Sequence, residues 1–299
     1  MATYNAANMV QFNEAIKSCT DGDTIEVLAD LDWNDVVDNV TATIKLGNVT
    51  TPFTTHGVVI NGNNHRIYNM TGNRISSQTY GTYIYDFHSS KAQINDLSFL
   101  NCDFGYKDTV IIFSSGSTTD ISINNCVLQG RFKYTMFKGR NGSTFNLNNC
   151  MITCNWSDYS PFKTATGIAP LFNYCWIRLT DYNAYNAGTG VSYAENLNGC
   201  YIDGKLNYVS SGNTPRFLYA VQNSCINVEV NAYQTNDIDV FIVPATGATA
   251  CNIINIDKIS TYSGYELTEE DSSTMNKCCT DTHMKDANYL ASVGFDIIP

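Results

Sequence analysis

Seven cysteines recur at an almost constant interval along this chain and set the strongest constraint on its fold. Successive members lie 24, 24, 25, 25, 25 and 26 residues apart. They are Cys102, Cys126, Cys150, Cys175, Cys200, Cys225 and Cys251. A period of this size indicates stacked repeats, because one repeat is too short to bury its own apolar face. We therefore expect equivalent side chains of successive repeats to lie one above another.

Apolar residues recur at fixed positions on either side of each cysteine. Two positions after it, where Asn227 is the exception, stand Phe104, Leu128, Ile152, Ile177, Ile202 and Ile253. Three positions before it stand Phe99, Ile123, Leu147, Phe172 and Leu197, and two places further back stand Leu97, Ile121 and Phe145. Spacing by two predicts β-strands whose alternate residues point inward. The inward parity changes between the two sides of the cysteine, so we expect the chain to bend there.

An asparagine occupies the predicted bend in repeat after repeat. These residues are Asn124, Asn148, Asn173, Asn198 and Asn223. Asparagine tolerates the left-handed backbone angles of a corner, and its amide can both donate and accept a hydrogen bond. We expect the stacked asparagines to hydrogen-bond along a column and the cysteines to be small, reduced fillers of the core.

The repeat pattern predicts an all-β fold. Coils of about 24–26 residues, each rising about 4.8 Å, would pair every strand with the coils above and below it. This arrangement is a single-chain parallel β-helix, which we expect over residues 21–262.

The first part of the chain adds a resemblance to a known superfamily. Residues 5–33, "NAANMVQFNEAIKSCTDGDTIEVLADLDW", read as an amphipathic helix with Asn5 as its N-cap, followed by a turn and a strand. One face of this helix carries Met9, Phe12, Ile16 and Cys19. With the later segment "GVVINGNNHRIYNMTG", this pattern resembles the right-handed parallel β-helix, or pectate-lyase-like, superfamily. The resemblance implies a right-handed coil and an N-terminal capping helix within residues 1–20. Such scaffolds carry lyases, hydrolases, esterases, adhesins and viral spikes, so the likeness concerns fold rather than function.

The period disappears in residues 263–299, which we expect to form a C-terminal cap or docking tail. A short helix is predicted over residues 284–293, with Met284, Ala287, Leu290 and Ala291 on one side. The segment "MKDANYLASVGFDI" is similar to segments that follow β-structured repeats in surface proteins of gut bacteria and their phages. The nearby "CCTDTH" lacks the second half of a zinc motif, so we expect neither a metal nor another cofactor.

Composition excludes several classes of partner. The net charge is −11 with 17 Lys+Arg and no basic cluster, which argues against nucleic-acid binding. No stretch approaches the roughly 18 apolar residues of a membrane helix, and the polar first 20 residues lack the features of a signal peptide. Eleven cysteines are an odd number with a repeat-like spacing, which favours reduced thiols and folding in a cytoplasm over a disulfide framework.

A recurring aromatic position is the main candidate binding feature. Most of its members follow a repeat cysteine by seven to nine residues, with a tryptophan close by: Tyr134, Trp156, Tyr159, Tyr182, Tyr208 and Tyr233. An aromatic ladder beside polar side chains suits a long carbohydrate, because sugar rings stack on flat faces. The alternative is that these tyrosines only stack on one another and seal the edge of the core.

A catalytic alternative uses the same surface. Asp158 and Asp181 lie one coil apart, where two carboxylates at about 5 Å could serve a retaining glycosidase, and Lys133 could act as a base. The "GHG", "RIK", "WIDH" and paired "DD" patterns of the superfamily's pectin-cleaving enzymes are absent from the sequence. The four histidines do not follow the period, and we expect His65 to support a turn.

These observations favour a structural or binding role over an enzyme. Phage virion proteins fold in the host cytoplasm and are exposed after lysis, which reconciles reduced thiols with an extracellular scaffold. We expect a tail-fibre, spike or capsid-decoration component, in a form that could be homotrimeric. Its partners would be other virion proteins, through the tail or the N-terminal cap, and a host surface polysaccharide. The alternatives are a polysaccharide lyase or glycoside hydrolase, and a bacterial cell-surface adhesin.

Overall fold

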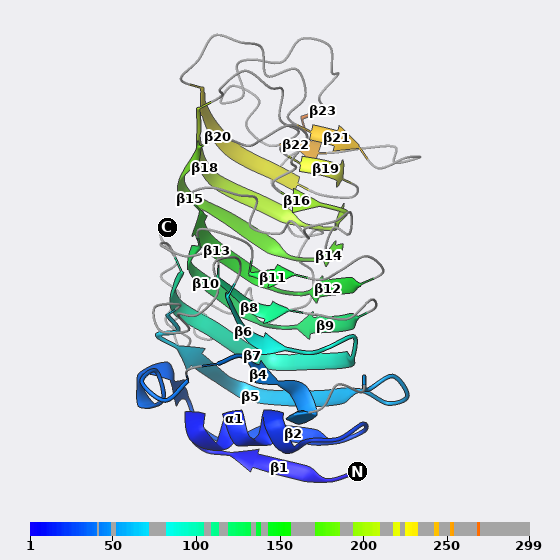
Figure 1. The fold of residues 1–299 in the computed structure, drawn as a ribbon. Coiled ribbons are helices and arrows are strands. Elements are labelled where there is room, and N and C mark those ends of the chain that lie inside the picture. The colour runs from blue at the N-terminus through cyan, green and yellow to red at the C-terminus, as the bar shows by residue number, and fades with distance from the viewer. Residues whose placement is uncertain are drawn as a thin grey trace.

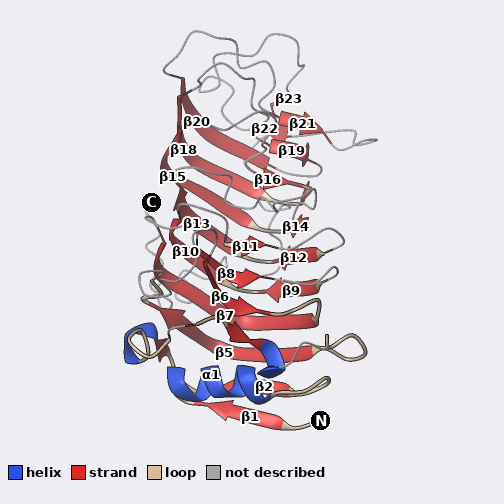
Figure 2. Cartoon of the chain, viewed as in Figure 1, coloured by secondary structure: helices blue, strands red, loops and turns tan. Residues whose placement is uncertain are grey.

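The computed structural model of the chain is mostly β, with one α-helix among the residues it describes (Figure 2). Those residues are 1–40, 42–48, 52–71, 82–104, 109–113, 119–132, 136–138, 143–156, 171–185, 194–209, 218–221, 225–232, 242–244, 252–253 and 268–269. Every strand pairing among them is parallel. The all-β prediction is therefore confirmed at this level.

The largest sheet has 16 strands and is strongly curled (Figure 1). Its strands are β1 (Thr3–Ala6), β2 (Thr24–Val27), β3 (Leu31–Asp32), β5 (Val58–Tyr68), β7 (Lys91–Phe104), β9 (Asp120–Asn124), β10 (Val127–Phe132), β12 (Thr144–Asn148), β13 (Met151–Trp156), β14 (Leu171–Asn173), β15 (Trp176–Tyr185), β17 (Leu197–Asn198), β18 (Tyr201–Val209), β20 (Cys225–Ala232), β22 (Asn252–Ile253) and β23 (Thr268–Glu269). The long strand β7 pairs with β9 through its first part and with β10 through its second. The sheet therefore passes continuously around the corner that separates the two rows of later strands.

Two smaller parallel sheets complete the described strands. One contains β4 (Ile44–Lys45), β6 (Thr82–Asp86), β8 (Thr109–Phe113) and β11 (Phe137–Lys138). The other contains β16 (Ala194–Glu195), β19 (Leu218–Val221) and β21 (Ile242–Pro244). One apolar core joins side chains of the large sheet to those of the β4–β11 sheet and of the N-terminal helix.

The helix α1 (Met9–Ser18) lies at the N-terminal end of the curled sheet, as predicted (Figure 1). The expected apolar face is confirmed, because Met9, Phe12, Ile16 and Cys19 are all buried. The predicted cap at Asn5 is wrong. Asn8 is the N-cap, with its side chain accepting from the Gln11 N–H at 2.9 Å, while Asn5 lies in strand β1. A capping side chain must directly precede the first helical turn to reach its free N–H groups.

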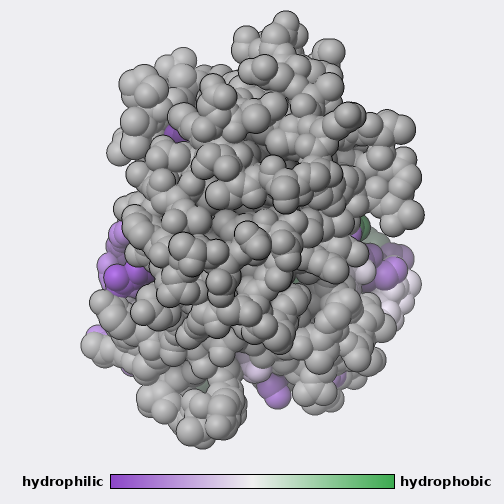
Figure 3. Space-filling view, turned by 90° about the horizontal axis from the view of Figure 1, so that it is seen from above, coloured by the Kyte–Doolittle hydropathy of each residue, from purple (hydrophilic) through white to green (hydrophobic). Residues whose placement is uncertain are grey.

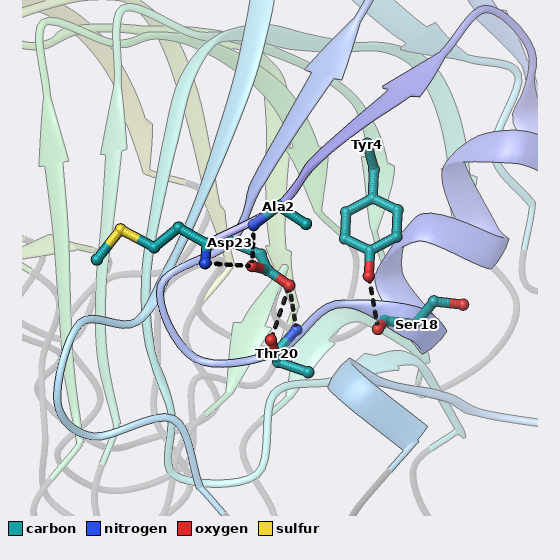
Figure 4. A network of polar contacts seen from close by, with 6 residues as sticks. Ala2, Tyr4, Ser18, Thr20 and Asp23 are labelled. Carbon is teal, nitrogen blue, oxygen red and sulfur yellow. Dashed lines mark hydrogen bonds and ion pairs between the residues drawn. The ribbon is translucent and has the colours of Figure 1, made fainter.

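The segment that links α1 to β2 is held by a buried carboxylate. Asp23 is 3% exposed and accepts hydrogen bonds from the backbone N–H of Ala2 and from the N–H and hydroxyl of Thr20 (Figure 4). Desolvation alone would raise the pKa of Asp23, but these donors outweigh it and lower the pKa below its ordinary value. After β2 and β3 come two short 3₁₀ helices, η1 (Trp33–Asp35) and η2 (Leu46–Asn48).

Four of the repeat cysteines form the predicted column. Cys126, Cys150, Cys175 and Cys200 are free, fully buried and placed one coil apart by the register of the strands that follow them. Each Sγ lies 3.2 to 3.6 Å from the carbonyl oxygen two residues earlier, so each thiol can donate to the backbone. Burial away from water raises the pKa of Cys126 and Cys175.

The assignment of Cys102 to this column is wrong. Cys102 lies opposite Gly130, and the pairs Asn95 with Asn124 and Phe99 with Leu128 place Leu97 at the foot of the column. The coil from Asn95 to Asn124 spans 29 residues, whereas the next spans 24. A constant period of 24 residues therefore misaligns β7 by five residues. It matches Phe104 with Leu128, whereas in the structure Phe99 pairs with Leu128 and Phe104 with Phe132.

Cys225 also leaves the column, because it pairs with Tyr201 rather than with Cys200. This one-residue shift explains the exception at Asn227, since Ile226 takes the position beside Ile202. Cys251 and Asn223 lie outside the described residues.

The predicted asparagine ladder is confirmed. The Nδ2 of Asn198, Asn173 and Asn148 donates in each case to the Oδ1 of the asparagine one coil earlier, over 3.5, 3.0 and 2.8 Å. The ladder continues through Asn124, Asn95 and Asn61 to Glu26.

The sequence predicts left-handed backbone angles at the ladder asparagine, and this is wrong. The left-handed residue at each corner is the one after the ladder asparagine. Positive φ occurs at Asp96, Asn125, Asn149, Tyr174 and Gly199. The ladder asparagine is the last extended residue of its strand, which lets its side chain stack in register with the strands on either side.

Candidate binding face on the outer side of the large sheet

The site residues predicted from the sequence can be placed only in part. Lys133, Tyr134, Asp158, Tyr159 and Tyr233 lie outside the described residues, as do the expected C-terminal helix and the "CCTDTH" segment. The backbones of four others are described, but their side chains are not: Trp156 in β13, Asp181 and Tyr182 in β15, and Tyr208 in β18.

The backbone register of the predicted aromatic ladder is irregular. Tyr182 pairs with Leu206, while Tyr208 pairs with Ala184 and Ala232. The two tyrosines are therefore offset by two positions along their strands rather than placed directly beside each other. Stacking of these rings, and the proximity of Asp158 to Asp181, stay predictions.

A different row of side chains occupies the outer side of the sheet. Each cysteine of the column is followed by a residue that points away from the core, because the next residue along points into it. These residues are Val127, Met151, Trp176 and Tyr201, in adjacent register on β10, β13, β15 and β18.

The middle of this row is apolar and buried, although it lies on the outer side. Leu100, Val127 and Met151 are 4%, 1% and 0% exposed and form a second apolar cluster, separate from the core. Tyr68 and Trp176 pack against it at its two ends. The sequence contains a signal for this burial that the repeat pattern alone did not reveal. The runs "CVL", "CMI", "CWI" and "CYI" place two apolar residues in succession, which is typical of strands covered on both faces.

An aromatic and cationic group stands at one end of the outer cluster. The rings of Trp176 and Tyr201 meet edge to face, with centroids 5.7 Å apart at 63°. The guanidinium of Arg178 lies 4.8 Å from the centroid of the Trp176 ring. Tyr201 is buried, whereas Trp176 and Arg178 are partly exposed. The exposed part of the indole ring, with the guanidinium at its border, suits a sugar ring or a planar side chain of a partner.

At the other end, near the N-terminus, lies a cluster of charged groups formed by β5 and by Asp30, the residue before β3. Asp30 accepts from Arg66 Nε at 2.8 Å and lies 3.3 Å from His65 Nδ1. All three side chains are about one-third exposed. His65 lies within β5 directly after Asn63 and Asn64, which have positive φ, where the register of β5 with β7 shifts.

Tyr68 extends this charged cluster toward the outer apolar cluster. The Arg66 guanidinium lies 5.6 Å from the Tyr68 ring centroid, and Asp32 is paired with Tyr68 in register. Desolvation and the nearby carboxylates of Asp32 and Asp30 raise the pKa of the Tyr68 phenol. The phenol therefore stays protonated and can donate a hydrogen bond. The Asp30 carboxylate already lies within hydrogen-bonding distance of Arg66 and His65.

A further ion pair lies beyond the row. Arg131 Nε and Nη2 donate to the two carboxylate oxygens of Asp103 at 3.1 and 2.9 Å, and both side chains are nearly half exposed. A solvated pair of this kind contributes little to stability.

The outer side of the sheet thus carries an apolar centre with charged and aromatic ends. In the end view of Figure 3, the visible described surface is mostly hydrophilic.

Within the described ranges, no group of three or more His, Cys, Asp or Glu residues is placed to hold a metal ion. The helices found in this part of the chain are too short and too polar to cross a membrane.

Comparisons with known proteins add no relative to this picture. No family model matches the chain, and searches of the curated proteins and of the solved structures found no match. The functional argument therefore depends on the residues themselves.

Proposed function

We propose that the chain forms a right-handed parallel β-helix, with a capping helix within residues 1–20, coils over residues 21–262 and a tail over residues 263–299. Three features support it: the period of 24 or 25 residues between ladder asparagines, the uniformly parallel pairing, and a core between rows of strands. Handedness follows from the rule that parallel crossovers are right-handed in nearly all proteins.

We further propose that this β-helix is a non-enzymatic structural protein of a phage virion. Its outer face would bind a host surface polysaccharide or a neighbouring virion protein. The observation that carries this proposal is the pair of Trp176 and Arg178, which lie partly exposed at the end of the buried outer cluster with the guanidinium 4.8 Å from the ring centroid. Buried free thiols favour folding in a reducing host cytoplasm before release by lysis.

Binding to an array of bacterial surface polysaccharides tests the glycan part of this proposal. Trp176→Ala should weaken binding about tenfold, as expected for loss of about 1.4 kcal/mol of ring contact, whereas Trp176→Phe should keep most of it. Tyr174→Ala is the matched control, because Tyr174 is an exposed aromatic on the neighbouring corner. Equal losses in Trp176→Ala and Tyr174→Ala would contradict a site on the outer face.

The virion part has its own test. Mass spectrometry of purified phage particles from a host that carries the gene should detect the chain, and light scattering of the isolated protein should give the mass of a trimer if it forms a spike. Detection only in the cell envelope of an uninfected bacterium would instead support a surface adhesin.

A second function, cleavage of a polysaccharide, is favoured by the Asp30, His65 and Arg66 cluster. Asp30 lies 3.3 Å from His65 Nδ1 and 2.8 Å from Arg66 Nε, and all three side chains remain partly exposed. The carboxylate and the imidazole are groups that can transfer a proton in general acid–base catalysis, and the guanidinium would stabilise negative charge. Release of reducing ends or unsaturated uronates, abolished by Asp30→Asn, would establish it. The same assay on Asp158→Asn and Asp181→Asn tests the alternative carboxylates.

A further inference from the structure

Two exposed apolar side chains stand at one corner of the large sheet. Leu171, the first residue of β14, is 39% exposed, and Tyr174, which follows the ladder residue Asn173, is 46% exposed. One coil earlier these two positions hold Asn146 and Asn149, which are only partly exposed. A polar pattern is therefore replaced at both positions of the same coil by residues that lie exposed at the surface.

The backbone of Tyr174 makes this replacement unfavourable for the chain itself. Its φ is 54°, in the left-handed region that bulky residues rarely adopt. The same position holds Asn125 and Asn149 in the two preceding coils, and asparagine tolerates this region. Asn149 Nδ2 donates to Asn125 Oδ1 at 3.3 Å, but tyrosine has no amide that could extend the column. Strained residues of this kind cluster where a protein makes functional contacts.

The Tyr174 ring is held in place by the next coil. A Cβ added to Gly199 would lie 2.6 and 2.7 Å from Cδ1 and Cε1 of Tyr174, so the ring lies directly over this glycine and leaves no room for a side chain. The Tyr174 backbone N–H donates to the carbonyl oxygen of Asn198 at 2.9 Å. A ring that is fixed in advance loses little conformational entropy when it meets a partner.

The surface around this corner is uncharged. Strands β9, β12 and β14 stack one above another (Figure 1), and the corner strip consists of residues 122–125, 146–149, 171–174 and 196–199. The corner strip contains no charged side chain, although the chain carries 28 acidic and 17 basic residues. Most of its polar side chains are asparagines, and an amide both donates and accepts. Two identical strips can therefore hydrogen-bond to each other, whereas two acidic surfaces would repel.

We propose that the corner strip is the contact between copies of this chain, with Leu171 and Tyr174 of one copy packed against the corner strip of another. Interface cores are depleted of charged residues and enriched in aromatic ones, as this strip is. A second copy fits best, because each copy has a net charge of −11 and an uncharged strip lets two such copies meet with little repulsion. The inference rests on the proposed structural role and deepens it by naming the surface through which copies assemble.

Sedimentation velocity of the full chain at increasing concentration measures this association. We expect a dissociation constant in the micromolar range, because the contact belongs to the small end of protein interfaces. Tyr174→Asn gives the corner the residue that the two preceding coils carry, so its urea midpoint should equal or exceed that of the parent. The same variant should weaken association about tenfold or more, as expected for loss of an aromatic anchor.

Leu28→Asn is the matched control, since Leu28 is 52% exposed and lies outside the corner strip. It should leave association unchanged, whereas Leu171→Asn should weaken it and decides the test if Tyr174→Asn does not fold. A parent chain that stays monomeric at its highest soluble concentration would overturn the proposal. Association of Tyr174→Asn as tight as that of the parent would do the same.

The outcome is separable from that of the proposed function. A chain that self-associates through the corner strip but is absent from phage particles contradicts only the virion proposal. A monomeric chain found in those particles contradicts only this contact. If Tyr174→Asn loses glycan binding and the parent does not associate, the corner is a glycan subsite and the contact between copies is refuted.

Discussion

The asparagine ladder allows the most direct test of how the coils hold together. Asn148 lies near its middle, where its Nδ2 donates to Asn124 Oδ1 at 2.8 Å and its Oδ1 accepts from Asn173 Nδ2 at 3.0 Å. Asn148→Asp keeps the size and shape of the side chain and the bond from Asn173. It removes the donor, so that a carboxylate oxygen faces the Asn124 oxygen.

The expected loss of stability at pH 7 is about 2 kcal/mol. A hydrogen bond of this kind contributes about 1 kcal/mol net, and leaving a buried acceptor without its donor costs about 1–3 kcal/mol. The ladder asparagines are only partly buried, so the lower part of that range applies. Repulsion between the two oxygens acts in the same direction and is included in this figure.

The loss should depend on pH in a defined direction. Repulsion from Asn124 disfavours the charged form of the introduced carboxyl group and raises its pKa in the folded state above its unfolded value of about 3.9. The folded state then binds the proton more tightly, so stability relative to the parent rises as the pH falls. The protonated group can also donate to Asn124 and restore the missing bond.

Urea denaturation followed by tryptophan fluorescence at pH 7 and pH 4.5 measures both effects. Asn146→Asp is the matched control, because Asn146 is partly buried on the same strand and pairs in register with Ser122 and Leu171. It adds the same charge without touching the ladder. If the two variants lose the same stability at pH 7, or if the Asn148→Asp deficit does not shrink at pH 4.5, the ladder does not contribute as we reason.

Three further predictions test the register and the buried groups. Gly130→Ala should destabilise the protein by about 1–3 kcal/mol in the same assay, because an added Cβ would lie 2.5 Å from the carbonyl oxygen of Cys102; a neutral effect would contradict the corrected pairing of β7 with β10. Cys102, whose pKa burial raises to about 12, and the buried Cys150 should react with iodoacetamide at pH 8 only after denaturation, as mass spectrometry can show. Desolvation raises the pKa of Asp21, but the backbone N–H groups of residues 55–57 outweigh it and lower the pKa overall. The stability from Asp21 is therefore present above about pH 4 and lost as the pH falls further, so Asp21→Asn should weaken the acid dependence of the urea midpoint.

The sequence predicts the repeating part of this fold well because stacking gives equivalent residues equivalent environments. Cys126, Cys150, Cys175 and Cys200 stand where their spacing placed them. The prediction is wrong where a coil changes length, as in the 29-residue coil that ends at Asn124. A period alone cannot show how many residues a turn contains before the strand resumes.

The candidate sites were harder to predict for a different physical reason. Trp176 and Arg178 are brought together by alternation within one strand, and the apolar pairs after each cysteine are a local signal that could have located that face. The burial of Asn13 in α1 depends on residues such as Val36 and Val40, which lie beside it and belong to no repeat. Asn13 therefore reads in the sequence as an ordinary polar helix residue, although the structure buries it.

The side-chain hydrogen bonds of the asparagine ladders all run in one direction, and the sequence indicates where each ladder begins. Among the residues described, three columns have asparagines that donate toward the N-terminus, and each column ends on a carboxylate: Asn61 on Glu26, Asn125 on Asp96, and Asn69 on Asp32. An asparagine at the end of a column would leave its own NH₂ without an acceptor, whereas a carboxylate only accepts. The charged acceptor also strengthens the last bond and polarises the amides behind it. An acidic residue one coil before the first asparagine, at or beside the position in register with it, is therefore the physical signature of the coil where such a column begins.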